Sequence, residues 1–323
     1  MGINANNFVY NAFGLIIASE INLPELSKLN YREGLVDVLV QKANLTAMWS
    51  ELSDTNEFFA INGDICMFKV EGVAIYAIQG GKRISVSPID GASEDQIRLF
   101  ILGTSMGAVF MQRKILPLHG TAIAINGNAF AVVGSSGAGK STLASALLNK
   151  GYRLISDDLI PVTFNESNVP FVTSAYPQQK LWLESLNQFG MEAKQYRPLI
   201  DRADKFAIPV KHQFSTGRFP LVGVFELVKT EGDEIEMYPI HKLDRLRTLS
   251  KHTYRKSLLT YLELMEWHFK TITKMVNKID LFQLQRPVDR FTAHDLADLI
   301  ETKLPKGGKV NDKEPKSFVE SIG

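Results

Sequence analysis

The sequence has little of what secreted, cysteine-rich metal-binding or membrane-spanning proteins need. It contains one cysteine in 323 residues, Cys66, which excludes an intramolecular disulfide and a multi-cysteine metal site and favours a reducing cytosol. The first residues, MGINANNF, lack the basic and apolar regions of a signal peptide. The longest apolar run, from Leu99 to Met111, is too short to span a bilayer.

The chain also lacks an excess of charge of either sign. It has 36 Lys and Arg against 35 Asp and Glu, a net charge of +1, so no global field favours nucleic acid or an anionic membrane. The apolar fraction of 45% and the length fit one large or two smaller globular domains. We therefore expect a cytoplasmic protein without a nucleic-acid or membrane partner.

Residues 1–115 are predicted to form an N-terminal, antiparallel β-rich domain with a closing helix. Short runs rich in Val, Ile, Phe and Tyr alternate with tight glycine turns such as Asn62-Gly63-Asp64, a pattern typical of strands joined without crossover helices. The predicted strands are Val36–Val40, Phe58–Ile61, Ile65–Val70, Val73–Ile78 and Ile84–Ser87.

The closing helix of this domain is predicted to begin after Ser93. Ser93 and Gln96 have the spacing of a capping box, and the apolar stretch to Met111 follows them. Gly103 and Gly107 lie on one face of this helix, where we expect close packing in a core.

A hairpin is predicted to lead into a glycine-rich loop. Thr121–Ile125 and Ala129–Val133 are the arms, and Asn126-Gly127 is a strong two-residue turn signal. The loop is followed by a helix through Lys150, which Gly151 stops. The next strand, Tyr152–Ser156, is predicted to end on Asp157 and Asp158.

The loop matches the phosphate-binding pattern G-x-x-x-x-G-K-[ST]. Its glycines allow backbone N–H groups to converge on a phosphate, and the following helix directs the positive end of its dipole at the same anion. Lys140 is predicted to reach the β- and γ-phosphates of ATP, and the Ser141 hydroxyl to hold Mg²⁺. The predicted nucleotide-binding residues are Gly134, Ser135, Ser136, Gly137, Ala138, Gly139, Lys140, Ser141 and Thr142.

The strand before this loop is antiparallel to its predecessor, which is unusual for a P-loop protein. The arrangement argues against GTPases, helicases and transporter ATPases and favours a kinase built on a mixed sheet. Adjacent carboxylates such as Asp157 and Asp158 repel each other unless a cation is present, and Mg²⁺ supplies one. One carboxylate can then bind the metal while the other accepts the proton of an incoming hydroxyl. The hairpin returns His119 toward the same loop.

Together, His119-Gly120, the hairpin, the P-loop and the segment Gly151-x-Arg153-Leu154-x-x-Asp157-Asp158 resemble the catalytic core of HPr kinase/phosphorylase. The resemblance implies an α/β fold with a mixed sheet, akin to phosphoenolpyruvate carboxykinase, and an ATP- and Mg²⁺-dependent serine kinase. It implies that Asp158 is the catalytic base and that Asp157, with Ser141, belongs to the metal site. His119 would lie beside the phosphates, and Lys140 would keep its P-loop role.

The chain departs from this family at two places. Thr142 stands where the family usually has an acidic residue, and no counterpart of an EIRGLGI-type segment is found. Residues 176–190, YPQQKLWLESLNQFG, stand roughly in that place. We therefore expect that the substrate is not HPr.

Two further segments, Ala12–Glu25 and Lys251–Arg255, resemble a divergent branch of these kinases. Some members of that branch phosphorylate the C-terminal serine of lasso precursor peptides, so a peptide serine is the preferred acceptor. An HPr-like protein and a small-metabolite hydroxyl stay open as acceptors. A non-catalytic nucleotide sensor also stays open, although a mere binder needs no second carboxylate.

Residues 241–256 are rich in Lys and Arg and contain one acidic residue. They form either a solvated helix face or a site for the acceptor's C-terminal carboxylate or the ATP phosphates, with Arg245 or Arg255 as the forked donor. The role of His252 in this segment is open. Lys205 and Arg218 are further, unranked candidates.

The catalytic domain is predicted to span residues 116–304. Leu221–Val228 and Glu234–Ile240 are predicted to form a β-pair, and Thr292 with Asp295 to open a last helix ending near Lys303. A helical stripe indicates a long core helix or a homo-oligomer seam. The stripe consists of Leu258, Leu262, Met265, Phe269, Ile272, Val276 and Ile279. From residue 305 to residue 323 we predict a disordered tail.

Overall fold

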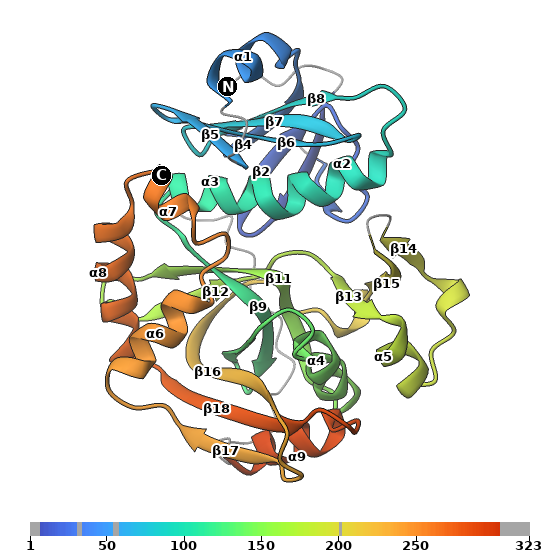
Figure 1. The fold of residues 1–323 in the computed structure, drawn as a ribbon, viewed down its shortest axis with the longest axis vertical. Coiled ribbons are helices and arrows are strands. Elements are labelled where there is room, and N and C mark those ends of the chain that lie inside the picture. Colours follow the sequence, from blue (N-terminus) through green and yellow to red (C-terminus); the bar gives the residue numbers. More distant parts are fainter. Residues whose placement is uncertain (1–6, 31–33, 54–57, 200–201, 304–323) are drawn as a thin grey trace.

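The computed structural model describes residues 7–30, 34–53, 58–199 and 202–303, and it confirms the mixed α/β class. The described residues form an eight-stranded sheet, a seven-stranded sheet and a small three-stranded sheet. In Figure 1 the eight-stranded sheet lies at the top and the seven-stranded sheet below it, with a long helical segment between them. No helix of the described residues is long and apolar enough to cross a membrane. The predicted tail at 305–323 lies outside these residues.

The eight-stranded sheet, called here the first sheet, contains all five predicted N-terminal strands. Strands β5 to β8 form the predicted antiparallel series, but β4 is parallel to both β2 and β8, so an antiparallel arrangement is wrong at this strand. Strands β1 and β2 form a further hairpin, for which we made no strand prediction. The order is β3-β1-β2-β4-β8-β7-β6-β5, and helix α1 spans Thr46–Leu52. The strands are β1 Phe8–Ala12, β2 Leu15–Ser19, β3 Ser27–Lys28, β4 Val38–Lys42, β5 Phe59–Asn62, β6 Ile65–Val70, β7 Ala74–Gln79 and β8 Arg83–Pro88.

The helical segment under this sheet begins directly after Ser93, as predicted. It consists of α2 (Glu94–Phe100), a π-helical turn (Ile101–Ser105) and α3 (Met106–Gln112). The Ser93 side chain makes no capping hydrogen bond, so the predicted capping box is wrong. The predicted close packing of the two glycines is confirmed, because a Cβ on Gly107 would lie 2.8 Å from the Tyr254 ring.

The seven-stranded sheet, called here the second sheet, contains the predicted hairpin. Asn126 and Gly127 both have positive φ, of 50° and 76°, as a type I′ turn requires. Strands β10, β9, β11, β12 and β16 pair in a closed circuit. The predicted β-pair is wrong, because β18 lies between β16 and β17. The strands are β9 Leu116–Ile125, β10 Asn128–Val133, β11 Arg153–Phe164, β12 Pro170–Thr173, β16 Arg218–Thr230, β17 Glu236–Pro239 and β18 Asp280–Pro287.

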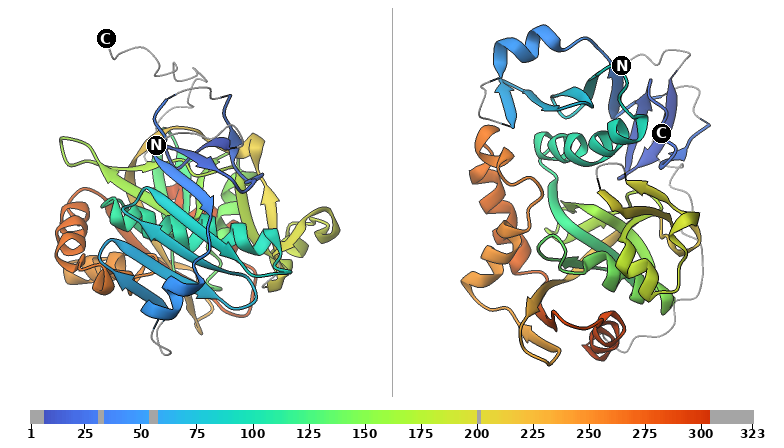
Figure 2. Two further views of the ribbon diagram at one scale, coloured as in Figure 1. Left: turned by 90° about the horizontal axis from the view of Figure 1, so that it is seen from above. Right: turned by 45° about the vertical axis from the view of Figure 1, so that its right-hand side comes forward.

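Helices cover both faces of the second sheet, as strand β10 illustrates. Phe130 and Val132 pack with helices α4 (Lys140–Asn149) and α9 (Ala293–Lys303), whereas the alternate residues Ala129, Ala131 and Val133 pack with α6 (Leu243–Lys251) and α8 (Met265–Val276). This alternation is the two-residue period of a strand with two buried faces. The small sheet, β13 (Gln178–Trp182), β14 (Arg197–Leu199) and β15 (Arg202–Pro209), stands at the side with α5 (Leu183–Gln188), as Figure 2 shows.

The predicted long helix over residues 258–279 is instead broken. Helix α7 spans Leu258–Tyr261, Glu263 has a φ of +54°, and α8 follows. Met265 and Phe269, two residues of the predicted stripe, are exposed on α8. Helix α9 starts after Thr292 and ends at Lys303, as predicted.

Candidate active site

The P-loop lies between β10 and α4, where backbone geometry requires glycine. Gly134 has a φ of +156°, and a Cβ there would lie 2.6 Å from the carbonyl oxygen of Leu227. Gly139 has a φ of +104° and immediately precedes α4. The Lys140 ammonium donates to the carbonyls of Gly134 and Ser135, at 2.9 and 3.1 Å, and burial lowers the pKa of Lys140.

The loop borders a cavity of about 910 Å³. Of the nine predicted nucleotide-binding residues, eight line this cavity. Ala138 does not line it; its side chain is buried in the core, and its carbonyl accepts a hydrogen bond from Arg286. A cavity of this size can hold a nucleotide together with part of a second substrate.

The hairpin brings His119 to the same cavity. Gly120, its neighbour, pairs with Val133, and a Cβ at this glycine would lie 2.3 Å from the Val132 carbonyl oxygen. The His119 Nδ1 lies 3.0 Å from the carbonyl oxygen of Asp158. Because a carbonyl only accepts, Nδ1 must donate, and burial lowers the pKa of His119 and favours the neutral ring.

The strand with the two aspartates does not end there, contrary to our prediction. Strand β11 continues to Phe164, and its register against β9 shifts between Leu154 and Ser156. Asp158 has a φ of +73°, in the left-handed region. Successive side chains of a regular strand point to opposite faces, whereas Asp157 and Asp158 both line the cavity, because the backbone at Asp158 departs from strand geometry.

Asp157 is buried and held by three hydrogen bonds. Its Oδ1 accepts from Thr121 at 2.6 Å and from Ser141 at 3.2 Å, and its Oδ2 accepts from the backbone N–H of Lys180 at 2.8 Å. A hydroxyl and a carboxylate side by side at the start of a P-loop helix are the protein ligands that Mg²⁺ takes in such sites. Ser141 and Asp157 therefore fit Mg²⁺.

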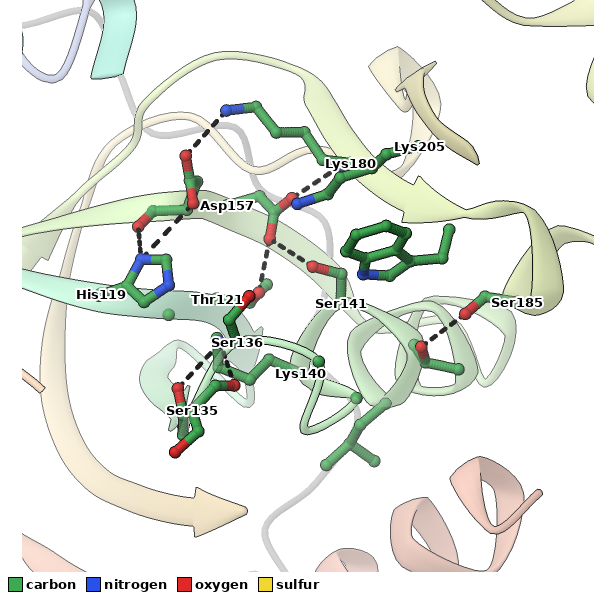
Figure 3. Close-up of a pocket in the computed structure, with 18 of the residues that line it drawn as sticks. His119, Thr121, Ser135, Ser136, Lys140, Ser141, Asp157, Lys180, Ser185 and Lys205 are labelled. Atoms are coloured by element: carbon green, nitrogen blue, oxygen red, sulfur yellow. Dashed lines mark hydrogen bonds and ion pairs between the residues drawn. The ribbon is translucent and has the colours of Figure 1, made fainter. Parts of the chain in front are cut away.

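Asp158 is bound to a lysine that was not among the candidate residues. Its Oδ2 lies 2.8 Å from the Lys180 ammonium, and its Oδ1 lies 3.5 Å from His119 Nδ1; both partners, Lys180 and His119, are labelled in Figure 3. Burial alone would raise the pKa of Asp158, but the charge and the hydrogen bond of the Lys180 ammonium hold it well below its usual range. The same ion pair raises the pKa of Lys180 despite its burial.

Lys180 comes from β13, inside the segment 176–190. The only signal in the sequence was a lysine in an otherwise strand-like stretch, QQKLW. The preceding residue, Gln179, accepts from Ser145 and donates to the Ser141 carbonyl, both at 2.8 Å. These bonds fix β13 against α4, so the small sheet positions Lys180 over the P-loop.

The remaining candidate cations divide into two groups. Lys205 and Arg255 line the cavity, and Arg255 donates to Thr104 at 3.1 Å. Arg218 and Arg245 do not line it: Arg218 stacks on Phe171 and donates to Thr163, and Arg245 donates to the carbonyls of Val276 and Ile279. Of the two donors left open by the sequence, Arg245 or Arg255, it is Arg255 that lines the cavity.

His252 lines the cavity through a segment attached to β9. Its carbonyl accepts from the His119 backbone N–H at 2.8 Å, and its Nε2 lies 2.8 Å from Glu226. The Tyr254 N–H donates to the Pro117 carbonyl, which keeps the 251–255 segment alongside the start of β9. Thr142, the departure from the family pattern, is hydrogen-bonded to Ser185 of α5 at 2.8 Å.

A family model and several known proteins are similar to parts of this chain. The family model for the HPr Serine kinase C-terminal domain matches residues 112–184. The HPr kinase/phosphorylase of Lactobacillus gasseri is 30% identical over 96 residues, which are 27% of this chain and 30% of that protein. The HPr kinase/phosphorylase of Mycoplasmopsis pulmonis is 39% identical over 64 residues, which are 19% of this chain and 21% of that protein.

The chain thus spans less than a third of the length of these curated relatives. A solved structure, the Hpr(Ser) kinase/phosphatase from Coxiella burnetii, is similar with a TM-score of 0.30 and 17% identity, over 58% of this chain and 91% of that chain. The predicted resemblance to HPr kinases is confirmed by the family model and the curated relatives, and the residues that the family model matches contain the P-loop and both aspartates.

Proposed function

We propose that this chain is a phosphotransferase that moves the γ-phosphoryl group of ATP to a serine hydroxyl. The observation that carries the proposal is the position of Asp158, whose carboxylate lines the same cavity as the P-loop and lies within 3.5 Å of His119. A protein that only binds nucleotide needs the loop but no second carboxylate beside it. The matched relatives, which are named as kinases, support the same reaction.

In the proposed phosphoryl transfer, the residues of the site have separate roles. The P-loop amides and Lys140 hold the phosphates, and Ser141 with Asp157 would hold Mg²⁺, which neutralises charge on the β- and γ-phosphates. Asp158 accepts a hydrogen bond from the serine hydroxyl and directs its oxygen at the γ-phosphorus. The new O–P bond forms as the bond to the β–γ bridging oxygen breaks, ADP leaves with that electron pair, and the hydroxyl proton passes to Asp158.

The low pKa of Asp158 is compatible with this role. A carboxylate with a low pKa is ionised at neutral pH and can always accept a hydrogen bond, although it is a weak base. In a loose transition state little negative or positive charge develops on the attacking oxygen before the phosphoryl group is transferred, so orientation matters more than basicity. Lys180 keeps Asp158 ionised and in place.

The acceptor that we favour is a peptide whose serine is C-terminal. Two segments support this choice, Ala12–Glu25 and Lys251–Arg255, both of which resemble lasso precursor peptide kinases. Arg255 lines the cavity and can present a guanidinium fork to a carboxylate. The hydroxyl and the terminal carboxylate of one residue would then be bound by Asp158 and Arg255.

The experiment is incubation with γ-labelled ATP, Mg²⁺ and several acceptors in parallel. The acceptors are a peptide ending in serine, the same peptide with a C-terminal amide, HPr, and a metabolite extract. We expect label in the free-acid peptide and at least ten-fold less in the amide, and no label with the Lys140→Ala variant.

Each of the other outcomes would support a different function for the protein. Label in HPr or in a small metabolite alone would keep the kinase and reject the peptide acceptor. Label in no acceptor, with ATP still bound, would indicate a nucleotide sensor.

A further inference from the structure

We propose that the end of the cavity over the first turn of α4, between α5 and the loop from residue 288 to residue 292, binds the purine base of the nucleotide. The inference rests on the proposed function, because it assumes that the P-loop binds a nucleoside triphosphate. It assigns a subsite to residues that the phosphoryl-transfer chemistry does not use.

The direction of the nucleotide follows from the arrangement of the loop. The lysine of a P-loop reaches the β- and γ-phosphates, and Asp158 must face the γ-phosphorus for transfer to occur. The transferred group therefore lies at the end of the cavity with His119, Asp158 and Lys180. The nucleoside must leave in the other direction, past Thr142 at the start of α4.

The cavity continues in that direction between two walls. One wall is α5, which contributes Ser185 and Gln188 and is joined to α4 by the hydrogen bond between Thr142 and Ser185. The other wall is the connection between β18 and α9, which contributes Val288 and Phe291. The walls approach each other through Phe189 and Phe291, whose ring centroids are 5.5 Å apart.

The lining of this end is mixed: Phe291 and Val288 offer apolar surface, and Glu184, Asp289 and Arg290 line it too. Phe291 is held at steep angles by two aromatic neighbours, at 80° to Phe189 and 68° to His294, so its orientation is fixed. Val288 is 46% exposed, although it is apolar. Aromatic and apolar side chains bind nucleobases by stacking, and Gln188 at the rim has the amide groups that can hydrogen-bond to a base edge.

The floor of this end is Arg286, which belongs to the protein's own structure. Its Nε donates to the Ala138 carbonyl at 2.9 Å and its Nη1 to the Pro287 carbonyl at 2.8 Å. These bonds connect the P-loop to the connection that carries Phe291. The phosphate subsite and the proposed base subsite are therefore rigidly linked.

Another aromatic residue that lines the cavity, Trp182, directly precedes α5. The Lys205 ammonium lies 5.3 Å from the centroid of its ring, and Trp182 ends β13, the strand that carries Lys180. It therefore lies on the element that positions the cations near Asp158. Phe291 is the aromatic residue that we assign to the base.

The test compares two ligands that share phosphates and differ in the base. We would measure the dissociation constants of ATP and inorganic tripolyphosphate, each with Mg²⁺, by calorimetry on the full chain. Phe291→Ala should weaken ATP binding about 5- to 100-fold, the range of one aromatic–base stack, and change tripolyphosphate binding less than two-fold. Phe171→Ala, on β12 and outside the cavity, is the matched control and should change neither constant.

A second variant covers the case in which Phe291→Ala does not fold. Phe291→Leu keeps an apolar side chain against the core and removes the aromatic face, so it should again weaken ATP binding alone. Unchanged ATP affinity in folded variants, or equal weakening of both ligands, would overturn the base subsite while leaving the proposed function intact. If the unmodified chain binds neither ligand, the proposed function fails first.

Discussion

The two large sheets of the molecule are built from different kinds of buried side chain. In the first sheet the core is aromatic: the Phe68 ring stacks on Tyr76 with centroids 4.7 Å apart, and Phe58 and Phe59 also contact it. Around the second sheet, buried carboxylates and cations stand close together, among them Asp157, Lys180 and Glu226. The first sheet is therefore held mainly by apolar packing, with the buried cation Arg98 beneath it paired to Glu25, whereas the second sheet keeps several costly polar groups in paired positions.

The paired polar groups of the second sheet surround a residue with a strained backbone conformation. Asp158, with its left-handed backbone, lies on β11 in the middle of the second sheet, beside the register shift. A non-glycine residue in this conformation costs of order 1–3 kcal/mol and persists where its surroundings hold it. Here the surroundings are His119 and Lys180, and Lys180 also lowers the pKa of Asp158. Variants of the second sheet should therefore affect transfer, and variants of the first sheet should affect stability.

The largest effect is expected for Asp158→Asn. Asparagine also tolerates the left-handed conformation, so the backbone should be retained. Loss of the carboxylate should lower the single-turnover rate of phosphoryl transfer by about 10²- to 10⁴-fold, with the ATP dissociation constant changed less than about three-fold. A variant that keeps transfer within five-fold of the parent would remove Asp158 from the mechanism.

The control for this variant is the partner of Asp158. Asp158→Asn leaves the Lys180 ammonium buried without its carboxylate, which destabilises the fold. Adding Lys180→Met should restore the melting temperature and leave transfer low. Recovery of transfer in the double variant would mean that the single variant acts through misfolding alone.

The second-largest effect is expected for the stability of the first sheet, in the variant Phe68→Ala. Phe68 is completely buried among aromatic rings, and its truncation should lower the free energy of unfolding by about 3–5 kcal/mol. Chemical denaturation measures this change. The transfer rate at low temperature, where the variant stays folded, should remain within two-fold of the parent, because Phe68 does not line the cavity. A large loss of transfer in folded protein would break the distinction between the sheets.

The features of the two sheets that could be predicted from the sequence are those determined by residues close together in the chain. The Asn126-Gly127 turn and the glycines of the P-loop are backbone requirements, so the hairpin and loop follow from local rules. Lys180 meets Asp158 only because the small sheet lies over the P-loop. The insertion of β18 between β16 and β17 is likewise a long-range pairing, which no local pattern specifies.

The residues of the site could be predicted from the sequence more completely than the strand arrangement of the second sheet that contains it. His119, Lys140, Asp157 and Asp158 meet at one cavity, although Asp157 and Asp158 do not end a strand. The hairpin pairing brings these residues together. The continuation of β11 instead depends on the left-handed backbone conformation of Asp158, which the residue type alone does not predict.

The smallest effect is expected for the pH dependence of the free energy of unfolding, to which Glu226 of the second sheet contributes. Glu226 is buried on β16 and accepts hydrogen bonds from His252 and Lys251, at 2.8 and 2.9 Å. Its hydrogen bond with His252 is the main cause that lowers the pKa of Glu226 from 4.5 to about 2, against the effect of burial. A carboxyl whose pKa is lower in the folded than in the unfolded chain stabilises the fold above the unfolded value, and this contribution is lost as the pH falls from 4.5 to 2.

Denaturation of the parent and of Glu226→Gln at a series of pH values measures this contribution. The stability difference between them should shrink by on the order of 2 kcal/mol between pH 5 and pH 2, because glutamine does not titrate. Glu231→Gln, which removes an exposed carboxylate just beyond the same strand, is the matched control for the loss of one negative charge. A constant difference for Glu226→Gln would mean that the Glu226–His252 pair contributes packing and no charge, and the second sheet would then resemble the first.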